Sequence, residues 1–478
     1  MGCSMIPGKE NATSAFARSK HAVEWILILL SCSLWAQAQT NQISVSPNFG
    51  SVPSGPATNG VVRLSLRDAI RMALRYNLGQ IESNENIRIA RGRRLQVLSA
   101  LLPHVNAGVS ETVQQLSAST LGIKNPLIPP VIGPFAYSTV QANINLTLFS
   151  YESIQRLQAA GTAEAAAQLS YSDTLDAVTL IVGNAYLQVI DTNSRIVARE
   201  AQVRNAQALY DQAVEELRAG TSPKIDVTRT GVQLHTEQYN LSVARNNFEI
   251  AKLNLARAIG LPLGQAFEIT DQLPYADLNP QNLDEALKSA YQSRSDFQAA
   301  LRLEKTAQQQ LSAVRGERYP VVAVNGNYGV QGATFGHSHG TFLFEGGLQV
   351  PVFTGRRIEG DITQAEAALR QRKAEAENVR GQVDYDVRKA YLDLQAAKDQ
   401  VFVAHQNVDL ANESLARSKE RFAAGVTDSV EVVQAQQALA SANDQYISSL
   451  YSHNLSKLQL ARALGVVQSS YNKYLAIP

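Results

Sequence analysis

The sequence predicts an α+β membrane protein made of two structural repeats, each with the order helix, strand, strand and long helical hairpin. Three observations support this prediction: a helical pattern that returns after 205 residues, two pairs of strand-like segments, and an export leader. The 478 residues could form two or three ordinary domains. The duplication favours instead one architecture built from two similar halves.

The long helices carry the clearest pattern. From Leu175 to Leu217, small or apolar residues recur at three- and four-residue steps without a Pro, and only Arg199 breaks this stripe. The same stripe returns from Val383 to Phe422. A seam with a seven-residue repeat is typical of coiled coils. Because this seam is rich in Ala and Val, we expect close helix packing, with seams shared between copies of the chain.

Both long helices end in matching turns, so each repeat contains an antiparallel hairpin, over 151–260 and 355–465. A Gly just past a helix end provides a left-handed cap, and Pro223 is compatible with the first turn of the returning helix. The returning helices also close alike, as LARAIG (255–260) and LARALG (460–465). The matching turns are Arg218-Ala219-Gly220-Thr221-Ser222-Pro223 and Ala423-Ala424-Gly425-Val426-Thr427-Asp428.

Residues 1–38 have the features of a signal peptide. Lys20 precedes a short apolar run that ends in Ala36-Gln37-Ala38, a small-x-small cleavage site, and the run is too short to span a bilayer. Its removal takes three of 43 basic and two of 42 acidic residues, so the mature chain is formally neutral and gives no support for nucleic-acid binding. Both cysteines, Cys3 and Cys32, precede this site; lipidation of Cys32 remains an alternative, although Leu30 is bulky for it.

Around the hairpins, the chain divides into further segments. Residues 39–62 lack periodicity and are expected to be an extended or disordered lead-in. The first repeat covers 63–260 and opens with amphipathic helices at 66–76 and 80–101, which recur at 283–291 and 296–318. The linker 261–282 is expected outside the helical tube. The second repeat covers 283–465, and the tail 466–478 is expected to be a short packed appendage.

Four segments alternate apolar and polar residues as half-buried strands do, at about 104–114, 139–149, 321–331 and 341–353. Each has the length of a tilted strand that crosses an outer membrane. One face would then contact lipid and the other water. A soluble sandwich is the alternative, which the leader and the long helices make less favourable.

The number of strands bears on assembly. Four strands cannot close a barrel, and an open edge is not tolerated in lipid. Copies of the chain must therefore share one barrel, with eight strands in a dimer or twelve in a trimer. We favour the trimer, because only a wide barrel leaves an aqueous lumen that the helices could continue as a hollow tube.

With these parts placed, the chain resembles the TolC family of outer membrane efflux proteins over nearly its whole mature length. The resemblance rests on the paired tips RAGTSPKIDVTRTGVQL (218–234) and FAAGVTDSVEVVQAQQAL (422–439), the paired helix ends, and GGLQVPVFTGRR (346–357). It implies a homotrimer in the cell outer membrane, with a twelve-stranded β-barrel continuous with an α-helical periplasmic tunnel. It also implies docking to a periplasmic adaptor and an inner-membrane transporter of an efflux or type I secretion system, which drives solutes through a passive duct.

The resemblance implies a narrow aperture at the tips, with acidic rings that map to Asp226 and Glu431. Such rings would attract cations; alternatively, both acids merely stabilise helix N-termini. Phe422, Thr427 and Gln434 stand where the family can have a tyrosine, an arginine and a second acid, so we predict closure by packing around Phe422. The expected adaptor-docking residues are Gly220, Thr221, Ser222, Pro223, Gly425, Val426, Thr427 and Asp428.

Two rival functions fit less well. An enzyme is not indicated, because the sequence has no nucleophile elbow or phosphate loop, and no cofactor is expected. His337 and His339 alone are a weak metal site, and exposed loop polarity explains them better. A periplasmic coiled-coil structural or adaptor protein is the second alternative, but the four strands and the full duplication fit it poorly.

Overall fold

The computed structural model describes residues 50–117, 129, 131–271, 275–278, 281–333 and 335–475. The expected leader 1–38, with Cys32, and residues 39–49 of the expected lead-in lie outside the described residues. In the part of the chain that is described, no helix has both the length and the apolar character needed to cross a bilayer.

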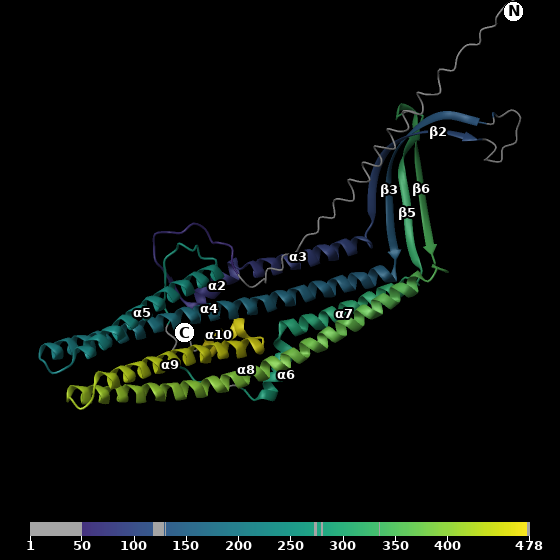
Figure 1. The fold of residues 1–478 in the computed structure, drawn as a ribbon. Coiled ribbons are helices and arrows are strands. Elements are labelled where there is room, and N and C mark those ends of the chain that lie inside the picture. Colours follow the sequence, from purple (N-terminus) through teal and green to yellow (C-terminus); the bar gives the residue numbers. More distant parts are fainter. Residues whose placement is uncertain are drawn as a thin grey trace, which may run out of the picture. The chain divides into compact units, whose positions relative to one another are not determined.

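Both halves of the chain follow the same order of elements (Figure 1). Each begins with two short helices, continues with two strands, and ends in two antiparallel long helices. The first half comprises α2 (Leu66–Tyr76), α3 (Leu78–Ser99), β2 (His104–Ser117), β3 (Val131–Phe149), α4 (Tyr151–Arg218) and α5 (Lys224–Ile259). The second comprises α6 (Leu283–Ser293), α7 (Ser295–Gly316), β5 (Val321–Gly332), the 3-10 turn η1 (Phe335–His337), β6 (Ser338–Gln349), α8 (Arg357–Ala423) and α9 (Ser429–Ala463), followed by α10 (Val467–Leu475).

The strand boundaries differ from those expected from the sequence. β3 begins at Val131 rather than near residue 139, because Gly133 and Pro134 suggest a turn but lie within the strand, opposite a register shift. An irregularity of this kind is where a strand tolerates Pro. β6 ends at Gln349 rather than at 353, two residues before Pro351, which has no N–H for a further ladder bond.

The four long strands form one antiparallel sheet in the order β2-β3-β5-β6. Paired residues across this sheet share a face, so the register decides where each side chain lies. One face is apolar over its width, with rows such as Val109–Val140–Val330 and Ala142–Tyr328–Phe342. The opposite face is polar, with rows such as Asn106–Asn143–Asn327 and Asn145–Asn325–Glu345. The sheet is therefore amphipathic, and both of its edges, β2 and β6, are open within one chain.

The helical stripes pack inside a single chain, which corrects the expectation that copies share them. Val178, Val182 and Val189 of α4 are buried in a core with α2, α5 and α9. Val383, Val387 and Leu394 of α8 are buried in a second core with α6, α7 and α9. A heptad pattern gives the burial of a helix face but does not identify the partner helix, which here belongs to the same chain.

A small parallel sheet joins segments that were expected to have no regular structure. β1 (Val62–Leu64), at the boundary between the lead-in and the first repeat, pairs with β4 (Phe267–Ile269), inside the inter-repeat linker. The Tyr186 hydroxyl on α4 donates to the Leu64 carbonyl at 3.0 Å and ties this sheet to the core. Strands of three residues are too short to show a two-residue period in the sequence.

Residues 275–278 of the linker lie against α9. The Tyr275 ring stacks on the fully buried His453 ring, with centroids 5.0 Å apart. The buried Lys457 ammonium donates to the Ala276 carbonyl, and Lys398 of α8 pairs with Asp277 at 2.7 Å. These contacts fix the linker to both helices of the second hairpin.

Candidate functional site at the hairpin tips

Both hairpin tips are built by the same helix-ending motif. Gly220 (φ 74°) follows α4 and Gly425 (φ 68°) follows α8, in a left-handed conformation that favours glycine. The Thr221 N–H donates to the Glu216 carbonyl at 2.9 Å, and the Val426 N–H donates to the Arg421 carbonyl at 3.0 Å. This bonding satisfies carbonyls at the end of each long helix. Most residues of both turns are exposed, whereas Ser222 and Thr427 are half-buried.

Asp226 links the two tips. Its carboxylate is only 6 % exposed and accepts hydrogen bonds from Ser222 (3.0 Å) and Arg229 (3.1 Å) in the first hairpin. It also accepts one from the Ser429 hydroxyl of the second hairpin, at 2.7 Å. Arg229 donates to the same hydroxyl at 3.2 Å. The buried carboxylate is therefore fully partnered and connects residues that are 203 positions apart.

Glu431, the equivalent acid of the second repeat, has different surroundings. It accepts from Thr427 at 2.6 Å and from Ser418 at 3.3 Å, and it pairs with Arg421 at 3.5 Å, all within its own hairpin. The hydrogen bond from Thr427 is the main cause that lowers the pKa of Glu431 below 4.5; burial opposes it and Arg421 adds to it. The side chain is still 38 % exposed, so Glu431 presents a negative charge to solvent at neutral pH.

Phe422 lies inside the tip rather than on its surface. Its ring is 8 % exposed and belongs to an apolar cluster with Leu415 of α8, Val432 and Leu439 of α9, and Leu209 of α4. The cluster thus includes both hairpins of one chain. Gln434, one turn past Glu431, is exposed.

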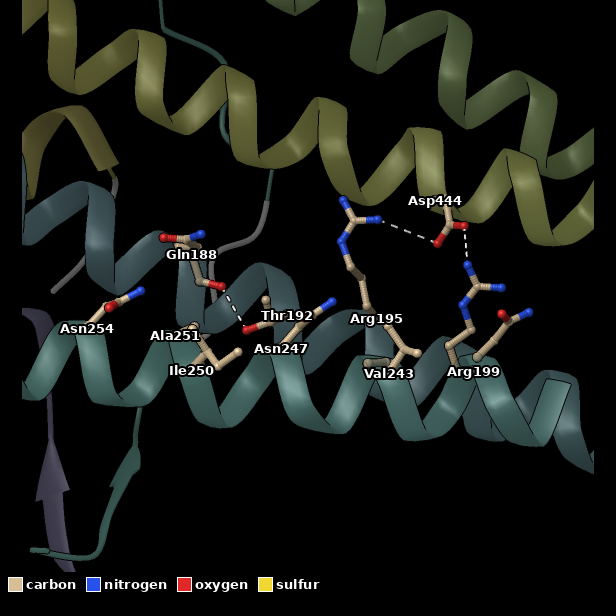
Figure 2. Close-up of a pocket in the computed structure, with 12 residues that line it drawn as sticks. Gln188, Thr192, Arg195, Arg199, Val243, Asn247, Ile250, Ala251, Asn254 and Asp444 are labelled. Atoms are coloured by element: carbon tan, nitrogen blue, oxygen red, sulfur yellow. Dashed lines mark hydrogen bonds and ion pairs between the residues drawn. The ribbon is translucent and has the colours of Figure 1, made fainter. Parts of the chain in front are cut away.

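Arg199 is a further contact residue between the hairpins, and Figure 2 shows it pointing from α4 toward Asp444 of α9. Its guanidinium lies 2.5 Å from the Asp444 carboxylate and 3.7 Å from that of Glu237 on α5. Arg195 reaches the same Asp444 at 3.6 Å. The sequence contained a signal for this contact, because Arg199 is the one charged residue in an otherwise small or apolar stripe. A stripe that is buried by packing alone does not need a charged residue.

The Arg199 cluster lies beside an open pocket of about 430 Å³ between α4, α5 and α9 (Figure 2). Val243 and Ile250 form its apolar part, and Asn240, Asn247 and Asn254 lie along the same helix at seven-residue spacing. Between the pocket and the tips, the contacts between the hairpins include polar ones, such as the bond from Gln437 to Gln233 at 3.3 Å, as well as the apolar Phe422 cluster. In the described ranges, no three His, Cys, Asp or Glu side chains gather as metal ligands.

Comparison with known proteins matches this chain to a family described as outer membrane efflux protein, over residues 82–261 and 286–466. Pyoverdine export outer membrane protein OpmQ of Pseudomonas putida is 23 % identical over 287 residues, which cover 59 % of this chain and 61 % of that protein, less than two thirds of its length. Outer membrane protein TolC of Vibrio cholerae is 23 % identical over 381 residues, or 77 % of this chain and 83 % of that protein. The crystal structure of VceC from Vibrio cholerae has a similar fold, with a TM-score of 0.74 at 19 % identity, covering 84 % of this chain and 96 % of VceC.

Proposed function

Because this chain belongs to the outer membrane efflux protein family, we propose that it is the exit duct of a tripartite efflux or type I secretion system. It is an outer membrane protein whose helices extend into the periplasm. In the proposed system, an inner-membrane transporter supplies the energy and a periplasmic adaptor joins it to the duct. The duct itself is passive, and the solute is selected by these partners.

The amphipathic sheet with two open edges carries this proposal. Its apolar face suits lipid, and its polar face suits an aqueous lumen. A spanning sheet must close, because unpaired strand edges are not tolerated in the hydrocarbon. β6 of one copy next to β2 of another extends the sheet, and three copies give twelve strands. Such a barrel is wide enough for an aqueous channel.

The helices support the same assembly. They contact one another in the order α3, α4, α7, α8 near the sheet and α5, α4, α9, α8 near the tips, so α5 and α8 are the end helices of the row near the tips. Both end helices carry exposed apolar pairs at seven-residue spacing, Val232 with Tyr239 and Val243 with Ile250 on α5, and Tyr385 with Leu392 and Val403 with Leu410 on α8. A head-to-tail contact of α5 with α8 of the next copy covers both stripes and closes a ring by rotation.

We assign the closing of this duct to the hairpin tips. The Asp226–Ser429 bond and the Phe422 cluster hold the two hairpins of a chain together. We assign the preference of the duct for cations to Glu431, the more exposed of the two acids. Asp226 is assigned the link between the two hairpins. The exposed turns, from Gly220 to Pro223 and from Gly425 to Asp428, are the proposed docking points for the adaptor.

Imaging and conductance test the proposal together. The purified protein in detergent should form trimers with a continuous bore, and it should produce discrete ion-conducting events in planar lipid bilayers. A monomeric particle, or a trimer without a bore, would overturn the duct.

A further inference from the structure

We propose that the segment after β6 binds a phospholipid of the leaflet that faces the periplasm. Val352 and Phe353 lie among the acyl chains, and Arg356 pairs with the headgroup phosphate. This inference rests on the proposed function, because it takes the apolar face of the sheet as the face that contacts lipid.

The length of the apolar face places the membrane boundary at this segment. The apolar positions of β6 begin at Phe342 and continue by strict alternation through Leu348 and Val350 to Val352. The seven residue steps from Phe342 to Gln349, the last residue of β6, extend about 24 Å along the strand, which corresponds to about 18 Å of height at a tilt near 40°. The apolar band of outer membrane barrels is about 25 Å tall. The few residues that follow Gln349 cover the remaining height, so the hydrocarbon layer that starts at Phe342 ends close to Val352 and Phe353.

Aromatic and apolar side chains gather at the same level of the chain. In a single chain, Val352 and Phe353 are 93 % and 88 % exposed, the highest values among the exposed large apolar residues that the structure describes. At the start of β5, Tyr319 is exposed and packs edge-to-face on Tyr151, with ring centroids 5.2 Å apart. Phe149, at the end of β3, is also exposed. Aromatic residues at the ends of the apolar band are typical of the boundary between lipid and water.

Arg356 provides the charge for a phosphate. It is exposed and has a left-handed backbone (φ 68°), directly after Gly355 (φ 61°). Such a conformation is unfavourable for a residue with a Cβ, and it persists where the surroundings impose it. Two neighbouring arginines have acidic partners: Arg357 pairs with Glu317 at 2.8 Å and Arg318 with Glu359 at 3.3 Å.

Among the described residues, Arg356 is left without an acidic partner, unlike its neighbours. A guanidinium three residues beyond an apolar boundary reaches the headgroup region, and its planar fork fits phosphate oxygens. The last paired residues of the sheet at this end are Val321 and Gln349, so residues 350–356 lie beyond strand pairing. Val350 and Val352 continue the alternation of the lipid-facing side of β6 past its last pair, which is why a phospholipid, rather than a protein, is the proposed occupant.

Tryptophan quenching tests the position of Phe353. The sequence has two tryptophans, Trp25 and Trp35, both in the expected leader, so a Phe353→Trp protein with a processed N-terminus carries a single tryptophan. In vesicles of phospholipids brominated near the headgroup, its emission should be quenched about twofold or more relative to unbrominated vesicles. The negative control is Leu263→Trp, at an exposed position in the inter-repeat linker, which should be unaffected. Quenching of the Phe353→Trp protein no greater than that of the Leu263→Trp protein would overturn the proposal.

A positive control separates this inference from the proposed function. Phe344→Trp, on the apolar face of β6 and inside the layer that starts at Phe342, should be quenched by bromine on the acyl chains. If neither the Phe344→Trp protein nor the Phe353→Trp protein is quenched, the sheet does not span lipid and the duct itself fails. If the Phe344→Trp protein is quenched and the Phe353→Trp protein is not, only the phospholipid inference fails.

Native mass spectrometry tests Arg356. The protein released from nanodiscs that contain phosphatidylglycerol should retain fewer lipids after Arg356→Gln, by about twofold or more. Arg370→Gln, the same change at an exposed position farther along α8, should leave retention unchanged. Equal retention by both variants contradicts the role of Arg356. Displacement of the lipid by millimolar inorganic phosphate would indicate a free-anion site instead, and would also overturn the proposal.

Discussion

At the scale of single residues, Asp226 and Glu431 show how equivalent positions acquire different roles. Asp226 is buried and bonds to both hairpins, whereas Glu431 is partly exposed and bonds only within its own. One partner is duplicated, because Ser222 donates to Asp226 as Thr427 donates to Glu431. The surroundings of the two acids differ because the other partners are not duplicated. Ser418, which donates to Glu431, has Ala213 as its counterpart, and Ala213 has no hydroxyl to donate.

Replacing Glu431 with Gln should reduce the cation preference of the channel. The reversal potential in a salt gradient should show the permeability ratio for potassium over chloride falling by roughly twofold or more, because three carboxylates leave one narrow mouth. The pKa of Glu431 is lowered from 4.5, so the wild-type preference should persist until the pH is well below that value. Gln434→Ala is the matched control, and an unchanged ratio after Glu431→Gln would contradict the assignment.

His453 should make the folded state sensitive to mild acid. Burial, followed by the charge of Lys457, lowers its pKa from 6.5 to about 4; Asp277 opposes this and Lys398 adds to it. The unfolded chain thus takes up a proton between pH 6.5 and 4 that the folded chain does not. Stability should fall over this window as the pH decreases, by up to about 3 kcal/mol.

Urea denaturation, followed by circular dichroism at several pH values, measures this effect. His453→Phe keeps a ring against Tyr275 but cannot titrate, so its denaturation midpoint should depend less on pH between 6.5 and 4. His235→Phe, at an exposed position on α5, should retain the wild-type dependence. A His453→Phe profile parallel to that of the wild type would exclude His453 as the source.

At the scale of elements, the contact between the two hairpins changes in character along its length. Near α2 and α10 it is an apolar core, in which Gly183 of α4 lets Leu458 of α9 approach closely. Toward the tips it becomes mixed, with the Arg199 cluster first and then the Asp226–Ser429 bond beside the apolar cluster of Leu209 and Phe422. Polar contacts can be exchanged for water when helices separate, so the part of each hairpin near the tips is better suited to move than the apolar core.

Breaking the Arg199 cluster should weaken the contact between the two hairpins near their tips. Arg199→Met removes the cation that lies 2.5 Å from Asp444 and 3.7 Å from Glu237, which should destabilise the chain by about 1–3 kcal/mol and increase the open-channel current. Asp444→Asn should act in the same direction. Because both changes break one contact, the double variant should be little worse than either single one. Denaturation midpoints and single-channel recordings provide the two measurements, and fully additive effects would show that the contact is not the cause.

Much of this arrangement could be predicted from the sequence, because it follows local periods. The heptad stripe predicted α4 and α8, and the alternation of apolar and polar residues predicted the four strands. Gly220 and Gly425 predicted the ends of the long helices. The Asp226–Ser429 bond could not be predicted, because it joins residues of different repeats that no local pattern connects. Nor could β1 and β4, which are too short for a period and depend on Tyr186 and the core for their position.

At the scale of the whole molecule, the sheet and the row of helices each leave surface at their two ends that one chain does not cover. β2 and β6 leave unpaired backbone at the two edges of the sheet, and α5 and α8 leave apolar stripes at the two ends of the helical row. One rotation between copies can pair the sheet edges and cover the helical stripes together, because the first half of one chain then contacts the second half of the next. The duplication therefore explains how a chain with two similar halves fits copies of itself.

This argument predicts that the α8 stripe holds the copies together. The double variant Leu392→Glu and Leu410→Glu places two charges per copy on side chains that are 71 % and 65 % exposed in one chain. The fold of each chain should tolerate them, and helical circular dichroism should remain, but mass photometry in detergent should show monomers in place of trimers. Leu263→Glu, on the exposed linker, should leave trimers intact. If the double variant stays trimeric, the helical stripes are not the interface, and the sheet edges alone would have to account for the assembly.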